Sequence, residues 1–365
     1  MPYEPKVGMS IEELDTPALL LDLDAFQRNV NKMAAFFADK TAGLRPHSKT
    51  HKCPEVARRQ LAAGAVGITC SKVSEAEVMA DAGVSDILIA NQVVGAIKID
   101  RLTDLAARCD LMVAVDNAGN VQELSTACCS KGVTLGVLVE VDIGMQRCGV
   151  RSGEEALALA RVVAQAPGLE FMGLQGYEGH LVHKPDPDER AAGVRKALGL
   201  LQATKVLIEM NGIPVPTISG GGTGTYDLSG TLPPMTEIQV GSYVFMDAKY
   251  IQVRPEFENS LTVLSTVLSR PVPERIVTDA GLKVMPPDFG WPKLLGYAAE
   301  IAGLSEEHAK LVAAEPASVA LQPGDRVQFI PSHCCTTVNL QDRLYVIQDG
   351  VLVDIWPVAA RGCSQ

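Results

Sequence analysis

Short apolar runs alternate with amphipathic segments through the first two-thirds of the chain. Most of these runs are almost continuously apolar, which is typical of strands buried on both faces of a parallel sheet. Eight strands are predicted, at Leu44–His47, Val66–Cys70, Asp86–Ala90, Leu111–Asp116, Leu135–Asp142, Phe171–Tyr177, Pro216–Ser219 and Glu237–Tyr243. Between them the apolar spacing is helical, and glycine often follows the end of a helix. The predicted helices are Pro54–Ala63, Ser74–Ala82, Ile97–Ala107, Asn120–Ser130, Gly153–Ala164 and Asp188–Met210.

The repeated strand–helix order defines the fold class. Eight such units over about 200 residues are the number that a (β/α)8 barrel contains. We therefore predict an α/β fold in which residues 19–257 form a TIM-type barrel. A doubly wound open sheet is the alternative architecture.

The last third of the chain has a different pattern. Its apolar runs are short and rich in β-branched residues, turn signals bound them, and most follow one another without a long helix between them. The segment Gln348–Gly350 is a typical hairpin turn. We predict a mostly antiparallel β domain over residues 258–365, with residues 1–18 packing on it. Its strands are predicted at Ser260–Ser269, Arg275–Asp279, Asp325–Pro331, Arg343–Gln348 and Val351–Trp356.

The charge and the cysteines narrow the class of protein. Lys and Arg number 32 against 43 Asp and Glu, a net charge of −11, which argues against binding to nucleic acid or to an anionic membrane. The sequence has no apolar run of about 18 residues and its acidic start lacks the apolar region of a signal peptide, so we expect a cytoplasmic protein. The nine cysteines lack the spacing of a disulfide framework and suit a reducing compartment.

Basic and imidazole side chains cluster where the first predicted strand ends. Arg45, His47, Lys49, His51 and Lys52 fall within eight residues. Barrel enzymes have their active sites at the carboxyl ends of the strands, and a lysine placed there can form a Schiff base with a carbonyl group. A solvated basic loop is the alternative interpretation.

Small residues follow the last two predicted strands. Ser219–Thr225 contains three successive glycines, and the eighth strand ends in Gly241-Ser242-Tyr243. Glycines let backbone N–H groups approach an anion, and barrels commonly hold phosphate at these two loops. We interpret the pair as a phosphate site, with a flexible connection as the alternative. A nucleotide P-loop is not supported, because no Gly-Lys-Ser/Thr follows.

The fifth and sixth predicted strands also end in polar side chains. Arg147 lies between two glycines, where its guanidinium can face a ring or a carboxylate, or remain a surface charge. Tyr177, His180 and His183 follow the sixth strand. A tyrosine and two histidines suit general acid–base chemistry, although a histidine is more often structural.

A histidine and a cysteine stand two positions apart near the end of the chain, at His333 and Cys335. On an extended strand, residues i and i+2 lie on one face. Imidazole and thiolate together suit zinc better than a hard ion such as Mg²⁺. Two protein ligands leave positions open for water or substrate, as a catalytic metal requires. A buried histidine with core cysteines is the alternative.

Several of these motifs, in this order, resemble the metal-dependent D-threonine aldolases, within the wider group of D-serine dehydratase and alanine-racemase-like pyridoxal phosphate (PLP) enzymes. The resemblance runs from Leu14-Asp15-Thr16-Pro17 to Trp356–Gly362. It implies a PLP-binding barrel followed by a β domain, and a homodimer. The motifs that carry it are Arg45–Glu55, Gln146–Val150, Ser219–Thr225, Gly241–Asp247 and Pro331–Leu340.

The resemblance also implies roles for individual residues. Lys49 matches the lysine that binds PLP, Arg147 the arginine that faces the pyridine nitrogen, and His183 the base on the substrate hydroxyl. His333 and Cys335 match the two metal ligands. The phosphate-holding positions fall on Tyr177, Gly222, Thr223, Gly241, Ser242 and Tyr243.

The metal motif departs from the aldolase pattern. Aldolases of the group usually have His-x-Asp, whereas its D-serine dehydratases have His-x-Cys with zinc. Zinc is therefore favoured here, with Mn²⁺ or Mg²⁺ as alternatives. We expect a lyase that cleaves D-3-hydroxy amino acids of the D-threonine type to glycine and an aldehyde. The alternatives are a D-serine or D-3-hydroxyaspartate dehydratase, an amino acid racemase, and a PLP carrier without turnover.

Overall fold

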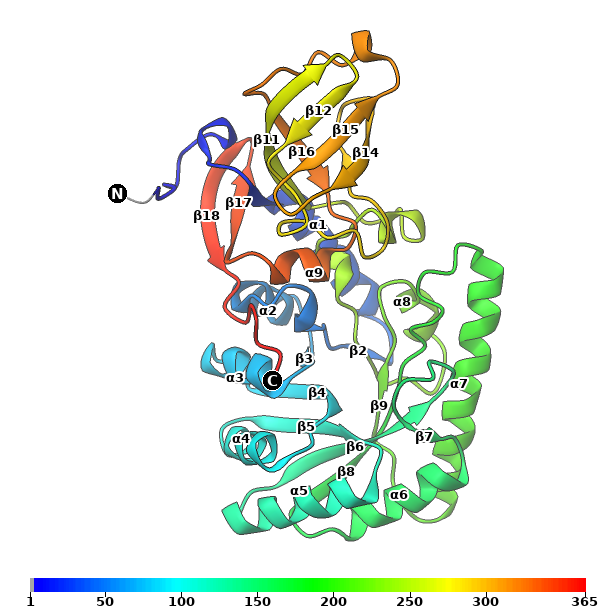
Figure 1. Cartoon of the computed structure of the whole chain (residues 1–365). Helices are drawn as coiled ribbons and strands as arrows, with labels where there is room; N and C mark the ends of the chain where they lie inside the picture. Colours follow the sequence, from blue (N-terminus) through cyan, green and yellow to red (C-terminus); the bar gives the residue numbers. More distant parts are fainter. Residues whose placement is uncertain (1–2) are drawn as a thin grey trace. The chain divides into compact units, whose positions relative to one another are not determined.

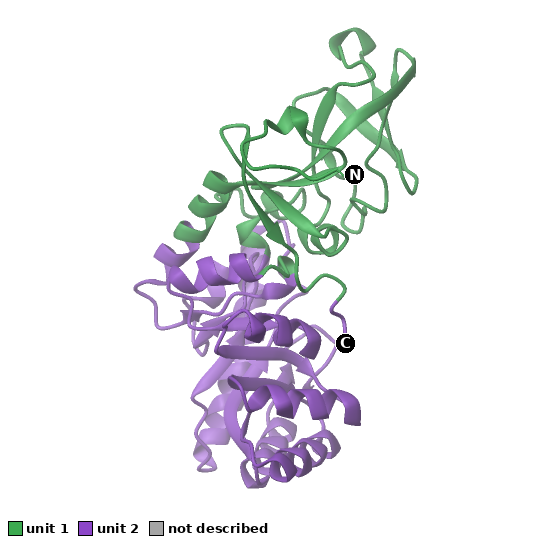
Figure 2. Cartoon of the chain, turned by 90° about the vertical axis from the view of Figure 1, so that its left-hand side faces the viewer, with its two compact units in different colours: residues 1–31, 50–53, 242–362 green, residues 32–49, 54–241, 363–365 purple. Residues whose placement is uncertain are grey.

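The computed structural model describes residues 3–365 and divides into two compact units (Figure 2). Unit 1 comprises residues 1–31, 50–53 and 242–362, and unit 2 comprises residues 32–49, 54–241 and 363–365. The units are groups of residues that lie close together, and the chain passes between them several times. The domain boundaries expected from the sequence, 19–257 and 258–365, stay a prediction.

Unit 2 is built on eight parallel strands, in the spatial order β2-β10-β9-β8-β6-β5-β4-β3. A further parallel bridge joins His47, just after β2, to Thr69 in β3, so the two ends of this order meet. The TIM-type barrel is confirmed, and the open doubly wound sheet is wrong. The strands are β2 Gly43–Leu44, β3 Ile68–Cys70, β4 Asp86–Gln92, β5 Asp110–Val115, β6 Leu135–Asp142, β8 Leu169–Gly176, β9 Thr217–Gly220 and β10 Glu237–Ile238, with the short β7 Val150–Arg151 beside β6.

Helices lie along the outside of this sheet (Figure 1). Local hydrogen bonds and backbone angles determine where these helices begin and end. In α5 the Asn117 side chain accepts hydrogen bonds from two backbone N–H groups of the first turn. Gly132 ends the same helix with a left-handed φ of 67°. All six predicted helices are present, within about two residues at each end. They are α2 Pro54–Ala62, α3 Val73–Asp81, α4 Ala96–Ala106, α5 Ala118–Lys131, α6 Glu154–Gln165 and α7 Pro187–Met210; the one-turn α8, Tyr226–Ser229, follows β9.

Unit 1 contains a second sheet, in the order β14-β15-β12-β11-β1-β17-β18, with β16 pairing to β11 and β13. All pairs are antiparallel except that between β1 and β17, which confirms a mostly antiparallel β fold. Its strands are β1 Ala18–Asp22, β11 Leu261–Val272, β12 Arg275–Thr278, β13 Lys293–Leu294, β14 Ala299–Leu304, β15 Ala309–Ala313, β16 Arg326–Ile330, β17 Arg343–Gln348 and β18 Val351–Pro357. The helix α9, Cys334–Asn339, lies in unit 1, and α1, Leu23–Phe37, begins in unit 1 and ends in unit 2. Single turns of 3₁₀-helix lie at Ile11–Glu13, Ser48–Thr50, Ser242–Val244, Tyr250–Gln252 and Pro316–Ser318.

Strand β1 was not among the strands predicted from the sequence. It lies between β11 and β17 in the middle of this sheet, and Ala18, Leu19 and Leu21 are fully buried there. A short apolar run carries no information about which distant strands it will pair with. Nearby, residues 8–11 hydrogen-bond to the hairpin at Gly350–Leu352.

None of the helices in the described residues 3–365 is long and apolar enough to span a membrane.

The pairing of β8 with β9 makes one glycine irreplaceable. Gly173 has a φ of 132°, and a Cβ placed there would lie 1.9 Å from the carbonyl oxygen of Thr217. We expect Gly173→Ala to lower the free energy of unfolding by at least about 1–3 kcal/mol, because the backbone must shift to relieve the overlap. Gly199→Ala in α7 is the matched control, since it meets open space, and should be neutral or stabilising by roughly 0.5–1 kcal/mol. Equal urea midpoints for the two variants would contradict this expectation.

Candidate functional site

Two positively charged side chains and an aromatic ring meet in unit 2, in segments that follow the carboxyl ends of β2, β6 and β8. Lys49 lies in a single turn of 3₁₀-helix, Ser48–Thr50, soon after β2. Its Nζ is 5.9 Å from the centre of the Tyr177 ring, and the Cζ of Arg147 is 5.7 Å from the same ring. The structure thus brings together three residues that the sequence analysis proposed separately.

The loop that carries Arg147 is held in shape by two carboxylates. Asp142, the last residue of β6, accepts hydrogen bonds through Oδ1 from the backbone N–H groups of Gly144 and Gln146, at 2.9 and 3.0 Å. Asp116, after β5, accepts one from the N–H of Gly149 at 3.0 Å. The guanidinium is therefore presented by a loop that is fixed at both ends.

The glycine-rich loop after β9 packs closely on the segment after β8. A Cβ on Gly222 would lie 3.3 Å from the ring of Tyr177, and one on Gly224 would lie 1.8 Å from the carbonyl oxygen of Val182. Glycine is needed at the second position because nothing larger fits. His183 follows Val182 directly and is half-buried, so the loop, Tyr177 and the His183 segment are neighbours.

A buried carboxylate anchors this loop through two hydrogen bonds. Glu178 is fully buried, and its Oε1 accepts hydrogen bonds from Oγ1 of Thr225 at 2.7 Å and from the hydroxyl of Ser229. Both hydroxyls belong to the stretch that begins with the glycines. Sequence reasoning singled out Tyr177 and His180 on either side of Glu178 but assigned it no role, since an isolated glutamate carries no recognisable pattern.

These residues fit a phosphorylated aldehyde cofactor such as PLP. Three groups are present that it requires: an amine at Lys49, a guanidinium at Arg147, and a glycine loop whose backbone approaches other segments more closely than any side chain would allow. Thr223 lies in this loop, buried, between the two closely packed glycines.

Unit 1 holds the second group of predicted residues. The donor atoms of His333, Cys334 and Cys335 lie within 4.8 Å of one another, a grouping that can hold a metal ion. The expectation that His333 and Cys335 lie on an extended strand is wrong. His333 has extended backbone angles, but it is the N-cap of α9, and Cys335 lies in the first turn of that helix. The side chains converge because the chain turns between them.

The charges in this cluster favour an anionic sulfur at Cys335. A hydrogen bond from Cys334 and the charge of His333 hold the pKa of Cys335 well below its usual value. Burial raises the pKa of Cys334, which stays a neutral thiol. Burial lowers the pKa of His333, but the Cys335 thiolate and the Asp247 carboxylate raise it to about 10. A thiolate, together with an imidazole that gives up its second proton to a metal ion, suits Zn²⁺.

Three neighbours of this cluster were missed by the sequence analysis. Asp247 accepts a hydrogen bond from Nδ1 of His333 at 2.9 Å. Oγ1 of Thr50, the residue after Lys49, is 3.3 Å from Sγ of Cys335. The ring of Phe289 lies 4.5 Å from that of His333, measured between centres. Asp247 and Thr50 do stand in motifs quoted for the resemblance, but no spacing rule links them to the metal residues.

The remaining predicted cofactor residues, Gly241, Ser242 and Tyr243, stand where the sequence passes from unit 2 to unit 1. Gly241 is the last residue of this part of unit 2, whereas Ser242 and Tyr243 belong to unit 1. Tyr243 is fully buried, with its ring packed edge-on against Phe257, and the side chain of Ser242 hydrogen-bonds to Cys334. Their role in holding phosphate stays a prediction.

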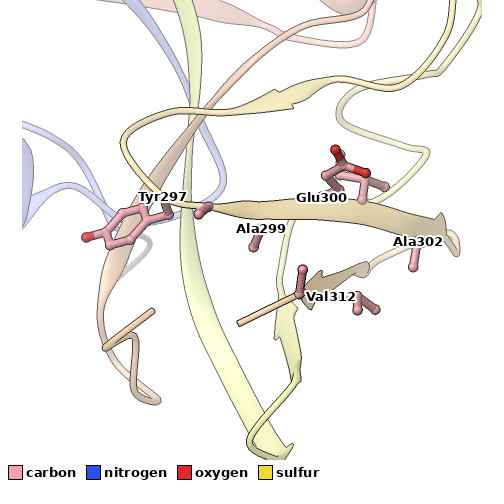
Figure 3. Close-up of a pocket in the computed structure, with 8 residues that line it drawn as sticks. Tyr297, Ala299, Glu300, Ala302 and Val312 are labelled. Carbon is pink, nitrogen blue, oxygen red and sulfur yellow. The ribbon is translucent and has the colours of Figure 1, made fainter. Parts of the chain in front are cut away.

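A hollow beside the edge strand β14 is a separate feature (Figure 3). It is lined by Tyr297, Glu300, Val312 and several alanines. These residues include a single carboxylate and no cysteine, histidine or lysine, so this hollow offers no chemistry of the kind found at the two clusters.

Comparison with known proteins places these features in one family. Residues 21–249 match the family model "Alanine racemase, N-terminal domain", and residues 260–347 match "Putative serine dehydratase domain". The chain is 42% identical to a D-threonine aldolase of Arthrobacter sp, over 100% of this chain and 97% of that protein. It is 36% identical to a 3-hydroxy-D-aspartate aldolase of Paracoccus denitrificans, covering 97% and 94%. The crystal structure of D-threonine aldolase from Filomicrobium marinum superposes with a TM-score of 0.96, at 42% identity, covering 99% of this chain and 100% of that one.

Proposed function

Because the chain belongs to the alanine racemase N-terminal domain family and, over its full length, to the group of the D-threonine aldolases, we propose that it is a PLP- and metal-dependent lyase that cleaves D-3-hydroxy amino acids to glycine and an aldehyde. The observation that carries the proposal is the convergence of Lys49, Arg147 and Tyr177 beside a closely packed glycine loop. The metal-ligating cluster of unit 1 supports it further.

In this proposal Lys49 would hold PLP covalently and Arg147 would face its pyridine nitrogen. The phosphate would be held by Tyr177, Gly222, Thr223, Gly241, Ser242 and Tyr243. When bound, PLP accepts the electron pair that remains after the Cα–Cβ bond of the substrate breaks. Arg147 stays charged throughout, because a guanidinium does not lose its proton in a protein. It therefore cannot protonate the pyridine nitrogen, which restrains competing reactions at Cα.

His333 and Cys335 would hold the divalent metal, Zn²⁺ by the nature of the donors, with Mn²⁺ or Mg²⁺ as alternatives. A divalent ion acts as a Lewis acid that makes the substrate's β-hydroxyl easier to deprotonate. His183 takes the hydroxyl proton, the Cα–Cβ bond breaks, and Cα regains a proton to give glycine. The Val182 backbone, packed against Gly224, sets the position of His183.

Phe289 favours an apolar substituent on Cβ of the substrate. Its ring lies against His333 and is 45% exposed, so it presents an apolar surface beside the proposed metal ligand. The neighbouring Asp288 is an exposed carboxylate that hydrogen-bonds to Thr336, in the same turn as the ligands. A second carboxylate on the substrate would be repelled there, so D-threonine-type substrates are preferred to 3-hydroxyaspartate.

A dehydratase is the second candidate, because the metal pair is His-x-Cys and residues 260–347 match a serine dehydratase domain. Lys49 would then remove the α-proton, and the products would be a 2-oxo acid and ammonia. A racemase would need a second base, and a PLP carrier would need no metal cluster. Assembly as a homodimer and a cytoplasmic location complete the proposal; light scattering after gel filtration tests the first.

The two reactions are separated by their products. Incubated with D-threonine, the PLP- and zinc-loaded protein should release glycine and acetaldehyde in equal amounts, without ammonia. Removing the metal with a chelator should lower the rate at least about tenfold, since the Lewis acid is lost, and adding Zn²⁺ or Mn²⁺ should restore it. Ammonia and 2-oxobutanoate as the main products would establish the dehydratase instead, and an unchanged rate after chelation would remove the metal from the mechanism.

The proposed link between Lys49 and PLP can be tested without measuring catalysis. Lys49→Ala should lack the visible absorbance of lysine-bound PLP, and borohydride reduction should no longer fix PLP to the peptide that contains position 49. Lys52→Ala is the matched control, since it removes a nearby lysine and should keep both signals. A label on some other lysine in the wild-type protein would overturn the assignment.

His183 is expected to act on the substrate rather than on cofactor binding. His183→Ala should retain PLP and metal while cleavage of D-threonine slows by roughly 10² to 10⁴-fold, the usual contribution of a general base. His180→Ala, at the exposed neighbouring histidine, is the comparison variant and should lose much less. Near-normal turnover by the His183 variant would exclude it as the base.

A further inference from the structure

Asp247 is a fully buried carboxylate that pairs with the imidazole of His333. Burying a carboxylate is costly unless hydrogen bonds replace the lost water. Oδ1 of Asp247 accepts from the backbone N–H groups of Lys249 and Tyr250, at 3.0 and 2.7 Å. Oδ2 accepts from the N–H of Cys334 at 3.1 Å and from Nδ1 of His333 at 2.9 Å. Four donors from two segments, residues 249–250 and 333–334, therefore fix this carboxylate in place.

Three of those donors are backbone groups that do not rotate, so the direction of the fourth bond, to the imidazole, is fixed as well. A carboxylate can only accept. When His333 gives up one of its two ring protons to act as a ligand, the remaining hydrogen must be on Nδ1, and Nε2 has the lone pair. Because Oδ2 also binds the N–H of Cys334, the same atom fixes both the ring and the start of the turn that leads to Cys335.

We infer that Asp247 is a positioning residue of the metal centre: it sets the tautomer and orientation of His333, so that Nε2 is the atom that binds the metal. The inference rests on the proposed function, in which His333 and Cys335 are ligands. Carboxylates that orient ligating histidines in this way increase metal affinity by about 10 to 100-fold.

The geometry predicts a specific effect of Asp247→Asn. If the amide oxygen faces Lys249 and Tyr250, the NH₂ group faces His333 and Cys334. The amide would then donate to Nδ1, which moves the ring hydrogen to Nε2 and blocks the ligating atom. The backbone bonds to residues 249 and 250 remain, so the variant should fold.

The test measures zinc affinity by competition with a chromophoric chelator, in the PLP-loaded protein. We expect Asp247→Asn to bind Zn²⁺ about 10 to 100-fold more weakly than the wild type, with PLP absorbance unchanged. Asp288→Asn is the matched control, because Asp288 is an exposed carboxylate bonded to Thr336 in the same turn, and its affinity should stay within about threefold. Equal losses in both variants, or none in Asp247→Asn, would overturn the inference.

A third variant separates this inference from the proposed function. His333→Ala should lose tight zinc binding; if it does not, the metal site itself is wrong. If His333→Ala loses zinc while Asp247→Asn keeps it, the metal site stands and the role of Asp247 is refuted.

Nitrogen-15 NMR of the zinc-loaded wild-type protein tests the same point without depending on the folding of a variant. His333, assigned by loss of its signals in His333→Gln, should show a protonated Nδ1 and a metal-bound Nε2. The reverse pattern would overturn the inference.

Discussion

The closure of the parallel sheet at His47 and Thr69 is the constraint on which the candidate site depends. The N–H of Thr69 donates to the carbonyl of Pro46, and the N–H of His47 donates to that of Val240, both at 2.8 Å. Because β2 and β3, the two ends of the spatial strand order, are joined here, the eight strands form a closed ring. The carboxyl ends of all eight strands then face the same side of that ring. Lys49, two residues beyond this closure, is thereby brought near Tyr177 although the two are far apart in the sequence.

A buried ion network supports the same closure. Arg45, just after β2, donates to Glu237 at 2.7 Å and to Asp86 at 2.6 Å, which ties together the ends of three strands. A Cβ on Gly67 would lie 2.1 Å from the Arg45 guanidinium, so this glycine makes room for the network. The pKa of Arg45 is raised: burial lowers it, but the charge of Glu237 and the bonds to Asp86 outweigh that effect.

The sequence predicted the parts of this molecule whose signal is local. The barrel strands and their helices were predicted because buried parallel strands and amphipathic helices repeat in order. Lys49, Arg147 and Tyr177, which the structure brings together, were singled out because they follow strand ends. The basic cluster that begins at Arg45 was only partly interpreted, since that arginine is bound to the buried Glu237 and the partly exposed Asp86. The strand expected at His333 was wrong because two residues with i, i+2 spacing converge equally well at a helix N-terminus. Asp247 had no role assigned, because its contact with His333 joins segments far apart in the sequence.

The position of β1 has a consequence for how the chain is made. This strand is synthesised before all the barrel strands, yet both of its neighbours in the sheet, β11 and β17, follow the barrel in the sequence. Until the ribosome reaches them, a stretch of three leucines has no sheet to join, and an apolar unpaired strand is prone to aggregate. Most barrel strands, by contrast, pair with neighbours nearby in sequence and can form as they emerge, and only the pairing of β2 with β10 waits for the end of the barrel. The apolar segment of the nascent chain therefore stays without its sheet partners while the whole barrel is being translated.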